Sequence, residues 1–329
     1  MQDKLTPRQV RAWSLCALSV PAAMALPGCG WLWVLGGSIL ACALAACQQA
    51  MQRHSGLCMR QAFARAFGYA GGRIMAAAEL LWLLFAASGA AAAGQIAFED
   101  DLGPFLPAIP LLLAALAGQK GRLAAGRVCA VLALCLAGLY AVIAAASLRH
   151  VQADWSRPQG VPADAALAFC LCLGPVCMAF VTAEEETPRI SPGTAAASAL
   201  LPAVPAFLTA ACLSPELARQ EPLPFLTLTK SLSVLSVMQR FELLLSVAQL
   251  LGLFALLTML VCAAERMLGA VRRKNGMGST GGVFCLLAFG GSILAYRLPI
   301  WSWAVGAAIF WGVVPILTQV IVNIKKSEK

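Results

Sequence analysis

Charged residues are scarce in this chain of 329 residues. They make up 12% of it, against about 25% in an average soluble domain. Apolar residues account for 60%, and the mean hydropathy is +0.79. Several stretches of about eighteen residues or more carry almost no charge, which is enough to cross the hydrocarbon core of a bilayer. This composition excludes a soluble enzyme, a disulfide scaffold and a disordered chain, and it predicts an all-α integral membrane protein.

Histidine is scarcer still, with two residues, and no enzymatic signature is present. The sequence lacks H-E-x-x-H, G-x-S-x-G and a P-loop. Most of the 13 cysteines lie within apolar runs, and no C-x-x-C pair is matched by a second one at zinc spacing. We therefore expect no enzyme, no catalytic residue, no cofactor and no metal site.

The net charge of +9 indicates cytoplasmic loops rather than a nucleic-acid partner, because Lys and Arg gather on the cytoplasmic side of membrane proteins. Apolar segments predict a single transmembrane domain over residues 1–329, with ten spans. The spans lie near 11–28, 31–50, 74–97, 104–118, 124–147, 164–183, 194–213, 241–264, 280–296 and 300–323. With the N-terminus inside, all but six of the 24 lysines and arginines fall on the cytoplasmic side. Both termini are therefore predicted to be cytoplasmic.

Ten spans divide into two halves of five, and an odd number in each half inverts one half relative to the other. The first repeat covers about 11–147 and the second about 164–296, with a final helix at 300–323 that completes spans six to ten. Proline interrupts the first span of each half, at Pro21 and Pro27 and at Gly174-Pro175. The prolines either kink packed helices or break helices 1 and 6 at a central site.

A site at these breaks would be lined by small and apolar residues. The predicted binding residues are Ser19, Val20, Pro21, Ala22, Ala23, Met24, Cys170, Gly174, Pro175 and Cys177. Unwound backbone at such breaks exposes amides that favour a carboxylate and carbonyls that favour a cation. The two together predict a small zwitterionic ligand.

Ionisable and polar groups within spans are candidates for gating or ion pairing. Glu79 either pairs with Arg73 or Arg11 or has a gating or proton-linked role. The further candidates are Arg127, Arg240, Glu242 and Gln249.

Four segments resemble the spore germination permeases, the B subunits of endospore germinant receptors within the amino acid–polyamine–organocation superfamily. They are LTPRQVRAWSLCALSVPAAMALPG at the first span, HSGLCMRQAFARAFGYAGGRI before the third, AGQKGRLAAGRVCAVL with Gly121, Gly126 and Arg127 at the fifth, and LPFLTLTKSLSVLSVMQRFELL with Arg240 and Glu242 before the eighth. The segments occur in the order in which that family has them.

The resemblance implies a LeuT-type fold and an amino acid-like germinant bound between spans one and six. It also implies partners in A-type and C-type receptor subunits, surrounding membrane lipid, and a place in the cell membrane or the spore inner membrane. Two other interpretations stay open: an ordinary amino acid transporter of the same fold, and a structural membrane subunit that binds no ligand.

Overall fold

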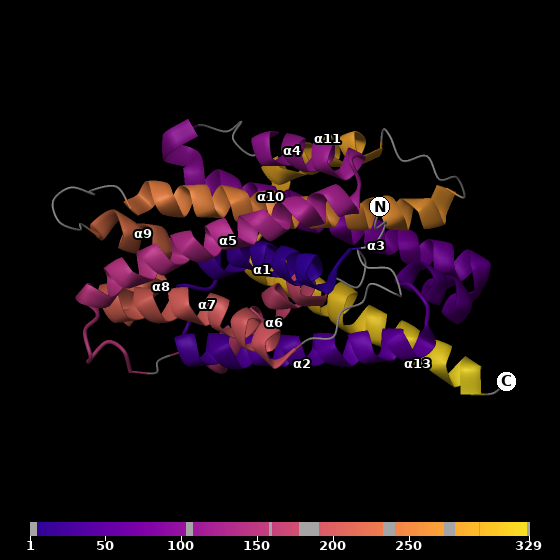
Figure 1. The fold of residues 1–329 in the computed structure, drawn as a ribbon, viewed down its shortest axis with the longest axis horizontal. Helices are drawn as coiled ribbons and strands as arrows, with labels where there is room; N and C mark the ends of the chain where they lie inside the picture. The colour runs from indigo at the N-terminus through magenta and orange to yellow at the C-terminus, as the bar shows by residue number, and fades with distance from the viewer. Residues whose placement is uncertain are drawn as a thin grey trace.

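The computed structural model describes residues 5–102, 108–157, 160–177, 191–232, 241–272, 280–295 and 297–327. Every regular element within these ranges is a helix. The longer helices are α1 (Pro7–Met24), α2 (Trp31–Ser55), α3 (Met59–Leu102), α4 (Ala108–Gln119), α5 (Arg122–Ser147), α6 (Pro162–Cys177), α7 (Pro192–Leu213), α10 (Phe241–Arg272) and α11 (Thr280–Ala295). Most of them run along the long axis of the molecule (Figure 1).

The last helical segment is continuous from Ile300 to Ser327 but changes its winding. It consists of α12 (Ile300–Ala307), the π-helical turn η3 (Ala308–Val313) and α13 (Val314–Ser327). Three short elements cap one end of the bundle: η1 (Leu148–His150), α8 (Pro215–Gln220) and α9 (Pro224–Ser231).

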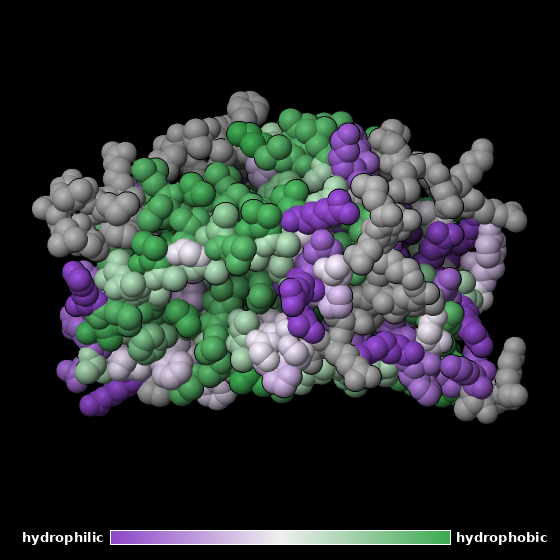
Figure 2. Space-filling model, viewed as in Figure 1, coloured by the Kyte–Doolittle hydropathy of each residue, from purple (hydrophilic) through white to green (hydrophobic). Residues whose placement is uncertain are grey.

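Six of the described helices are long and apolar enough to cross a membrane: Trp31–Ser55, Met59–Ile96, Arg122–His150, Pro192–Leu213, Glu242–Val271 and Ile300–Lys326. Figure 2 shows a broad hydrophobic surface with hydrophilic residues at both ends of the long axis. These findings confirm an all-helical membrane protein. A helix overlaps each of the ten predicted ranges, but the count of ten spans stays a prediction, because the other helices are shorter.

The first helix is the centre of the bundle. Its residues from Cys16 to Met24 are buried, and it packs against α5, α6, α7 and α10. The indole Nε1 of Trp13 donates a hydrogen bond of 2.9 Å to the carbonyl oxygen of Ala255 in α10. A capping box between Thr6 and Gln9 starts this helix at Pro7, earlier than the predicted start at residue 11.

Asp164 at the start of α6 holds the link between α1 and α2. Its Oδ2 accepts hydrogen bonds from the amides of Gly30, at 2.8 Å, and Val161, at 3.2 Å. The same oxygen lies 3.8 Å from the guanidinium of Arg219 in α8. One carboxylate therefore joins three segments that are distant in the sequence.

Candidate ligand-binding cavity

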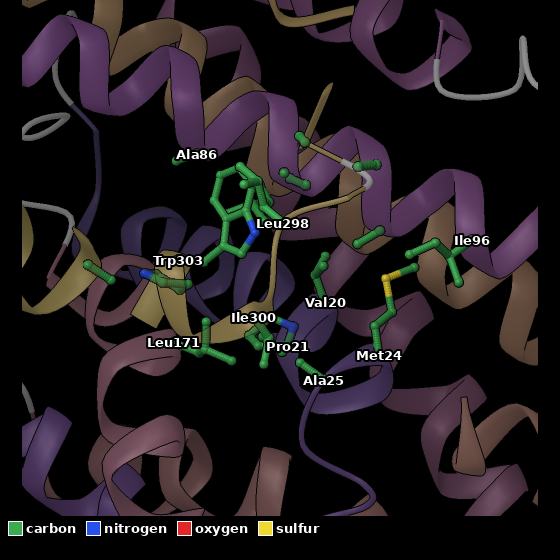
Figure 3. A pocket seen from close by; sticks show the side chains of 18 of the residues that line it. Val20, Pro21, Met24, Ala25, Ala86, Ile96, Leu171, Leu298, Ile300 and Trp303 are labelled. Atoms are coloured by element: carbon green, nitrogen blue, oxygen red, sulfur yellow. The ribbon is translucent and has the colours of Figure 1, made fainter. Parts of the chain in front are cut away.

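A cavity of about 330 Å³ lies where α1, α3, α6 and α10 meet α12 and η3. Figure 3 shows Val20, Pro21 and Met24 of α1 facing this space. Ile96 of α3 also lines the cavity. The residues that line the cavity come from helices in both halves of the chain, and α1, at the centre of the bundle, forms one of its walls.

The lining of the cavity is apolar. It consists of aliphatic side chains, prolines, one methionine, glycine and three tryptophans, with no charged, hydroxyl or amide side chain among the described lining residues. The alanines of α3 leave room for a ligand, and the indoles supply large flat surfaces. The Nε1 of Trp82 is buried and has no hydrogen-bond partner among the described residues. The cavity therefore suits a compact apolar or aromatic molecule with at most a few polar atoms.

Each of the three cavity tryptophans packs on a glycine of a neighbouring helix. The pairs are Trp82 with Gly306, Trp303 with Gly89, and Trp311 with Gly174. A Cβ atom at any of these glycines would clash with the ring of its tryptophan. The glycines therefore set how closely the indoles approach the facing helices.

The tryptophans belong to a set of five rings that we call the aromatic layer: Trp82, Phe85, Trp303, Phe310 and Trp311. Trp82 stacks on Phe310 with ring centroids 5.5 Å apart and meets Trp311 edge to face at 5.4 Å. Phe85 stacks on Trp303 at 3.8 Å. Such contacts fix the orientation of the rings that face the cavity.

The π-helical turn η3 carries Trp311, and a glutamine of α2 holds it in place. The Nε2 of Gln48 donates to the carbonyl oxygens of Trp311, at 2.8 Å, and Gly312, at 3.2 Å. The thiol of Cys177 in α6 donates to the Oε1 of Gln48. Single π-helical turns often occur at functional sites, and here the irregular turn is bonded to two other helices beside the cavity.

Four of the ten predicted binding residues line the cavity: Val20, Pro21, Met24 and Pro175. The other six are buried but are not part of its lining: Ser19, Ala22, Ala23, Cys170, Gly174 and Cys177.

The contacts of Gly174 with Trp311 and of Cys177 with Gln48 are described above, and two more of the six have identified structural contacts. Ser19 donates its hydroxyl to the carbonyl oxygen of Cys16, at 2.6 Å. Ala23 packs on a separate cluster with Ile143 and Phe225. Ser19 and Ala23 therefore help to hold the helices around the cavity and do not line it.

The predicted helix breaks are not confirmed. α1 is helical through Pro21 and ends at Met24, and α6 is helical through Gly174 and Pro175 to Cys177. The amides of Ala25 and Leu26 both donate to the Pro21 carbonyl, which closes the end of α1. Residues 178–183 of the predicted sixth span lie outside the described residues. The described helices therefore keep their turns at Pro21 and Pro175, whereas Pro27 lies in the non-helical link between α1 and α2.

The predicted polar residues fall into different environments. Arg127 of α5 is exposed, and Glu242 is partly exposed at the start of α10. Arg240 lies outside the described residues. Gln249 of α10 is 1% exposed, and neither end of its amide has a partner among the described residues. Arg127, Glu242 and Gln249 are not among the residues that line the cavity.

Glu79 differs from the other polar candidates. It is fully buried in α3, one turn before Trp82, and neither of its carboxylate oxygens has a hydrogen-bond partner among the described residues. No described hydrogen bond joins it to Arg73 or Arg11, so the predicted ion pair is not found there.

The sequence prediction missed the tryptophans of the cavity. Trp303 and Trp311 lie in the run WSWAVGAAIFWG of the last span, and Trp82 lies in the third span, three residues after Glu79. A signal was present, since three tryptophans and two glycines within one short stretch predict close aromatic packing. This cluster of tryptophans and glycines indicates a site at the last span, whereas the prolines indicate a site at spans one and six.

No family model and no curated protein matches this chain. Solved structures do match. One is Mhp1, a nucleobase-cation-symport-1 family transporter, in a closed conformation with bromovinylhydantoin bound. It has a TM-score of 0.66 and 13% identity, covering 96% of this chain and 77% of that one. Another is a Na⁺-coupled sialic acid symporter in a substrate-bound outward-open state, with a TM-score of 0.59 and 12% identity, covering 97% and 76%. Both are LeuT-fold transporters, so the LeuT-like fold is confirmed.

Proposed function

We propose that this protein is a transporter-like membrane protein that binds a small molecule with a compact apolar or aromatic body. The observation that carries the proposal is the apolar cavity of about 330 Å³ among α1, α3, α6, α10 and α12. Its position among helices from both halves of a LeuT-like fold supports alternating access to one central site. No catalytic role is proposed.

Among amino acids, the lining favours a large apolar or aromatic side chain. Burial of such a side chain contributes about 1.5–3 kcal/mol, whereas a buried charge without a partner is costly. We therefore propose L-leucine and L-phenylalanine as better ligands than L-alanine or L-glutamate. Bromovinylhydantoin, bound in Mhp1, is a useful additional probe.

Thermal unfolding of the detergent-solubilised protein tests this proposal. A ligand at a hundred times its dissociation constant stabilises the folded state by about 2.7 kcal/mol, so the best probe raises the unfolding midpoint measurably. Ala90→Phe, which fills the lining on α3, is expected to remove the shift. Leu81→Phe, on an exposed face of the same helix, is the matched control and is expected to keep it. If no probe shifts the midpoint, the third interpretation, a structural subunit without a ligand, replaces this one.

We further propose that the protein is a germinant-receptor permease-like subunit with both termini in the cytoplasm. The support is the order of the four segments that resemble spore germination permeases, together with the distribution of lysines and arginines along the chain. Copurification with A-type and C-type receptor subunits from a spore inner membrane tests the assembly. Uptake of the ligand by vegetative cells, with no such subunits copurified, favours the ordinary amino acid transporter instead.

A further inference from the structure

A second group of polar side chains lies on the other side of the aromatic layer from the cavity. Contacts at the two ends of this group place the group among α2, α3 and α13. At one end, Gln48 bonds to the carbonyls of Trp311 and Gly312, and the ring of Trp82 meets that of Trp311 edge to face. At the other end, Lys326 donates to the carbonyl of His54, at 3.1 Å. α2 and α3 therefore both run alongside α13 between these two levels.

At the same end as Lys326, Lys325 joins α13 to α3, because its Nζ donates a hydrogen bond of 2.7 Å to the carbonyl oxygen of Ala66. Between the two levels lie five residues that we call the polar band: Gln49, Gln52, Glu79, Gln319 and Asn323. Each has at least one buried side-chain oxygen or nitrogen without a partner among the described residues. Gln49, Gln52, Glu79 and Gln319 are at most 3% exposed, whereas Asn323 is partly exposed near the end of α13.

We propose that Glu79 is a proton-binding site and that water reaches it through the polar band from the ends of α2 and α13. Buried polar groups without protein partners are commonly bridged by water where several lie together. The band provides acceptors and donors spaced along two facing helices. When Glu79 releases its proton, the O–H bond of the carboxyl breaks and the proton passes to this water.

The surroundings of Glu79 favour its neutral form in this conformation, because an isolated buried carboxylate is costly. Within α3, Arg73 lies over the ring of Tyr69, at 4.6 Å, instead of bonding to Glu79. The other described titratable groups on helices packed against α3 are Glu242, Cys262, Glu265 and Arg266 of α10, Cys285 of α11, and Lys325 and Lys326 of α13. No described hydrogen bond joins any of them to Glu79.

Glu79 is one turn from Trp82, whose ring lines the cavity. Ligand binding that moves Trp82 would change the space around Glu79 and with it the affinity for the proton. We therefore infer that ligand binding is coupled to the protonation of Glu79. This coupling rests on the proposed function, whereas the proton site itself does not.

Infrared spectroscopy of the whole solubilised protein tests the site without any ligand. The contribution of Glu79 to the protonated carboxyl C=O band at neutral pH is expected to disappear in Glu79→Gln and to remain in Glu216→Gln, which alters an exposed carboxylate. If Glu79→Gln does not fold, Glu79→Asp is expected to shift the band instead of removing it. An unchanged band in the variant that folds overturns the proton site.

Exchange into D₂O tests whether water reaches Glu79 through the polar band. The Glu79 band is expected to shift quickly in the native protein and several-fold more slowly in Gln319→Leu and in Asn323→Leu. Gln119→Leu, at the exposed end of α4, is the matched control and is expected to exchange at the native rate. Equal exchange rates in all four proteins overturn the polar band as the route.

Proton uptake or release in weakly buffered solution, on addition of L-leucine or L-phenylalanine, tests the coupling. A change in the native protein that is lost in Glu79→Gln, with the thermal shift retained, supports it. A thermal shift without any proton change overturns the coupling but leaves the proposed function. If no probe produces a thermal shift, the proposed function is overturned. The infrared result then stands as a separate finding.

Discussion

The cavity and the polar band are neighbours that share α3 and the last helical segment, yet their chemistry is opposite. The cavity has no charged, hydroxyl or amide side chain in its described lining, whereas the band consists of such side chains alone. The aromatic layer lies between them, and Trp82 and Trp311 belong both to that layer and to the cavity. The comparison separates two tasks: the apolar side selects a ligand by shape, and the polar side has groups that bind water or a proton.

The largest effect is expected from Gly174→Leu, which places a side chain where the ring of Trp311 lies. Overpacking of this kind costs about 1–3 kcal/mol, and the displaced indole is expected to enter the cavity and abolish the ligand-induced thermal shift. Gly138→Leu is the control, because a Cβ there meets no atom within 4 Å. A native ligand shift in Gly174→Leu would show that the cavity does not depend on Trp311.

Trp303→Ala tests whether an indole face contributes to recognition. Aromatic pairs contribute about 0.5–1.5 kcal/mol beyond their buried area, so binding of L-phenylalanine is expected to weaken by up to about tenfold. Binding of L-leucine is expected to weaken less. Trp301→Ala, two residues away and exposed, is expected to leave both affinities unchanged in isothermal titration calorimetry. Equal losses for both ligands would mean that Trp303 acts through packing alone.

Gln48→Leu tests the link between α2 and the π-helical turn. It removes the two hydrogen bonds to the carbonyls of Trp311 and Gly312, and buried acceptors left without a partner cost about 1–3 kcal/mol. We expect a lower unfolding midpoint and weaker ligand binding, measured on the same thermal curves. Gln119→Leu, at an exposed position, is the control. If stability falls but affinity does not, the turn supports the fold without shaping the cavity.

The smallest effect is expected far from both regions, at Arg219. Its guanidinium is partly exposed and 3.8 Å from Asp164, so Arg219→Gln is expected to cost less than about 1 kcal/mol. Asp164→Ala removes the acceptor for the Gly30 and Val161 amides as well and is expected to cost more. A larger loss for Arg219→Gln than for Asp164→Ala would reverse this ranking.

The sequence predicted the membrane class and four of the residues that line the cavity. Long apolar runs are dictated by bilayer thickness, so the spans could be located without knowing how they pack. Val20, Pro21, Met24 and Pro175 were found because proline is visible in a sequence. The aromatic layer was not found, because the contacts of Trp82 with Phe310 and Trp311 join residues more than 200 positions apart. The predicted unwinding is not confirmed, since a helix tolerates Pro21 when neighbouring helices hold it.

The turn η3 also acts as a phase shift along the last helix. A π-helical turn contains one residue more than an α-helical turn, and each residue of an α-helix advances by about 100°. The extra residue therefore shifts the phase of α13 by about 100° relative to an uninterrupted helix, so that Trp303, which lines the cavity, and Gln319 of the polar band lie about 60° apart around the helix axis instead of about 160°. Deleting one residue from this turn would restore α-helical winding and keep α12 and α13 in their present relative orientation, so that the cavity side and the polar side of the last helix would both be retained.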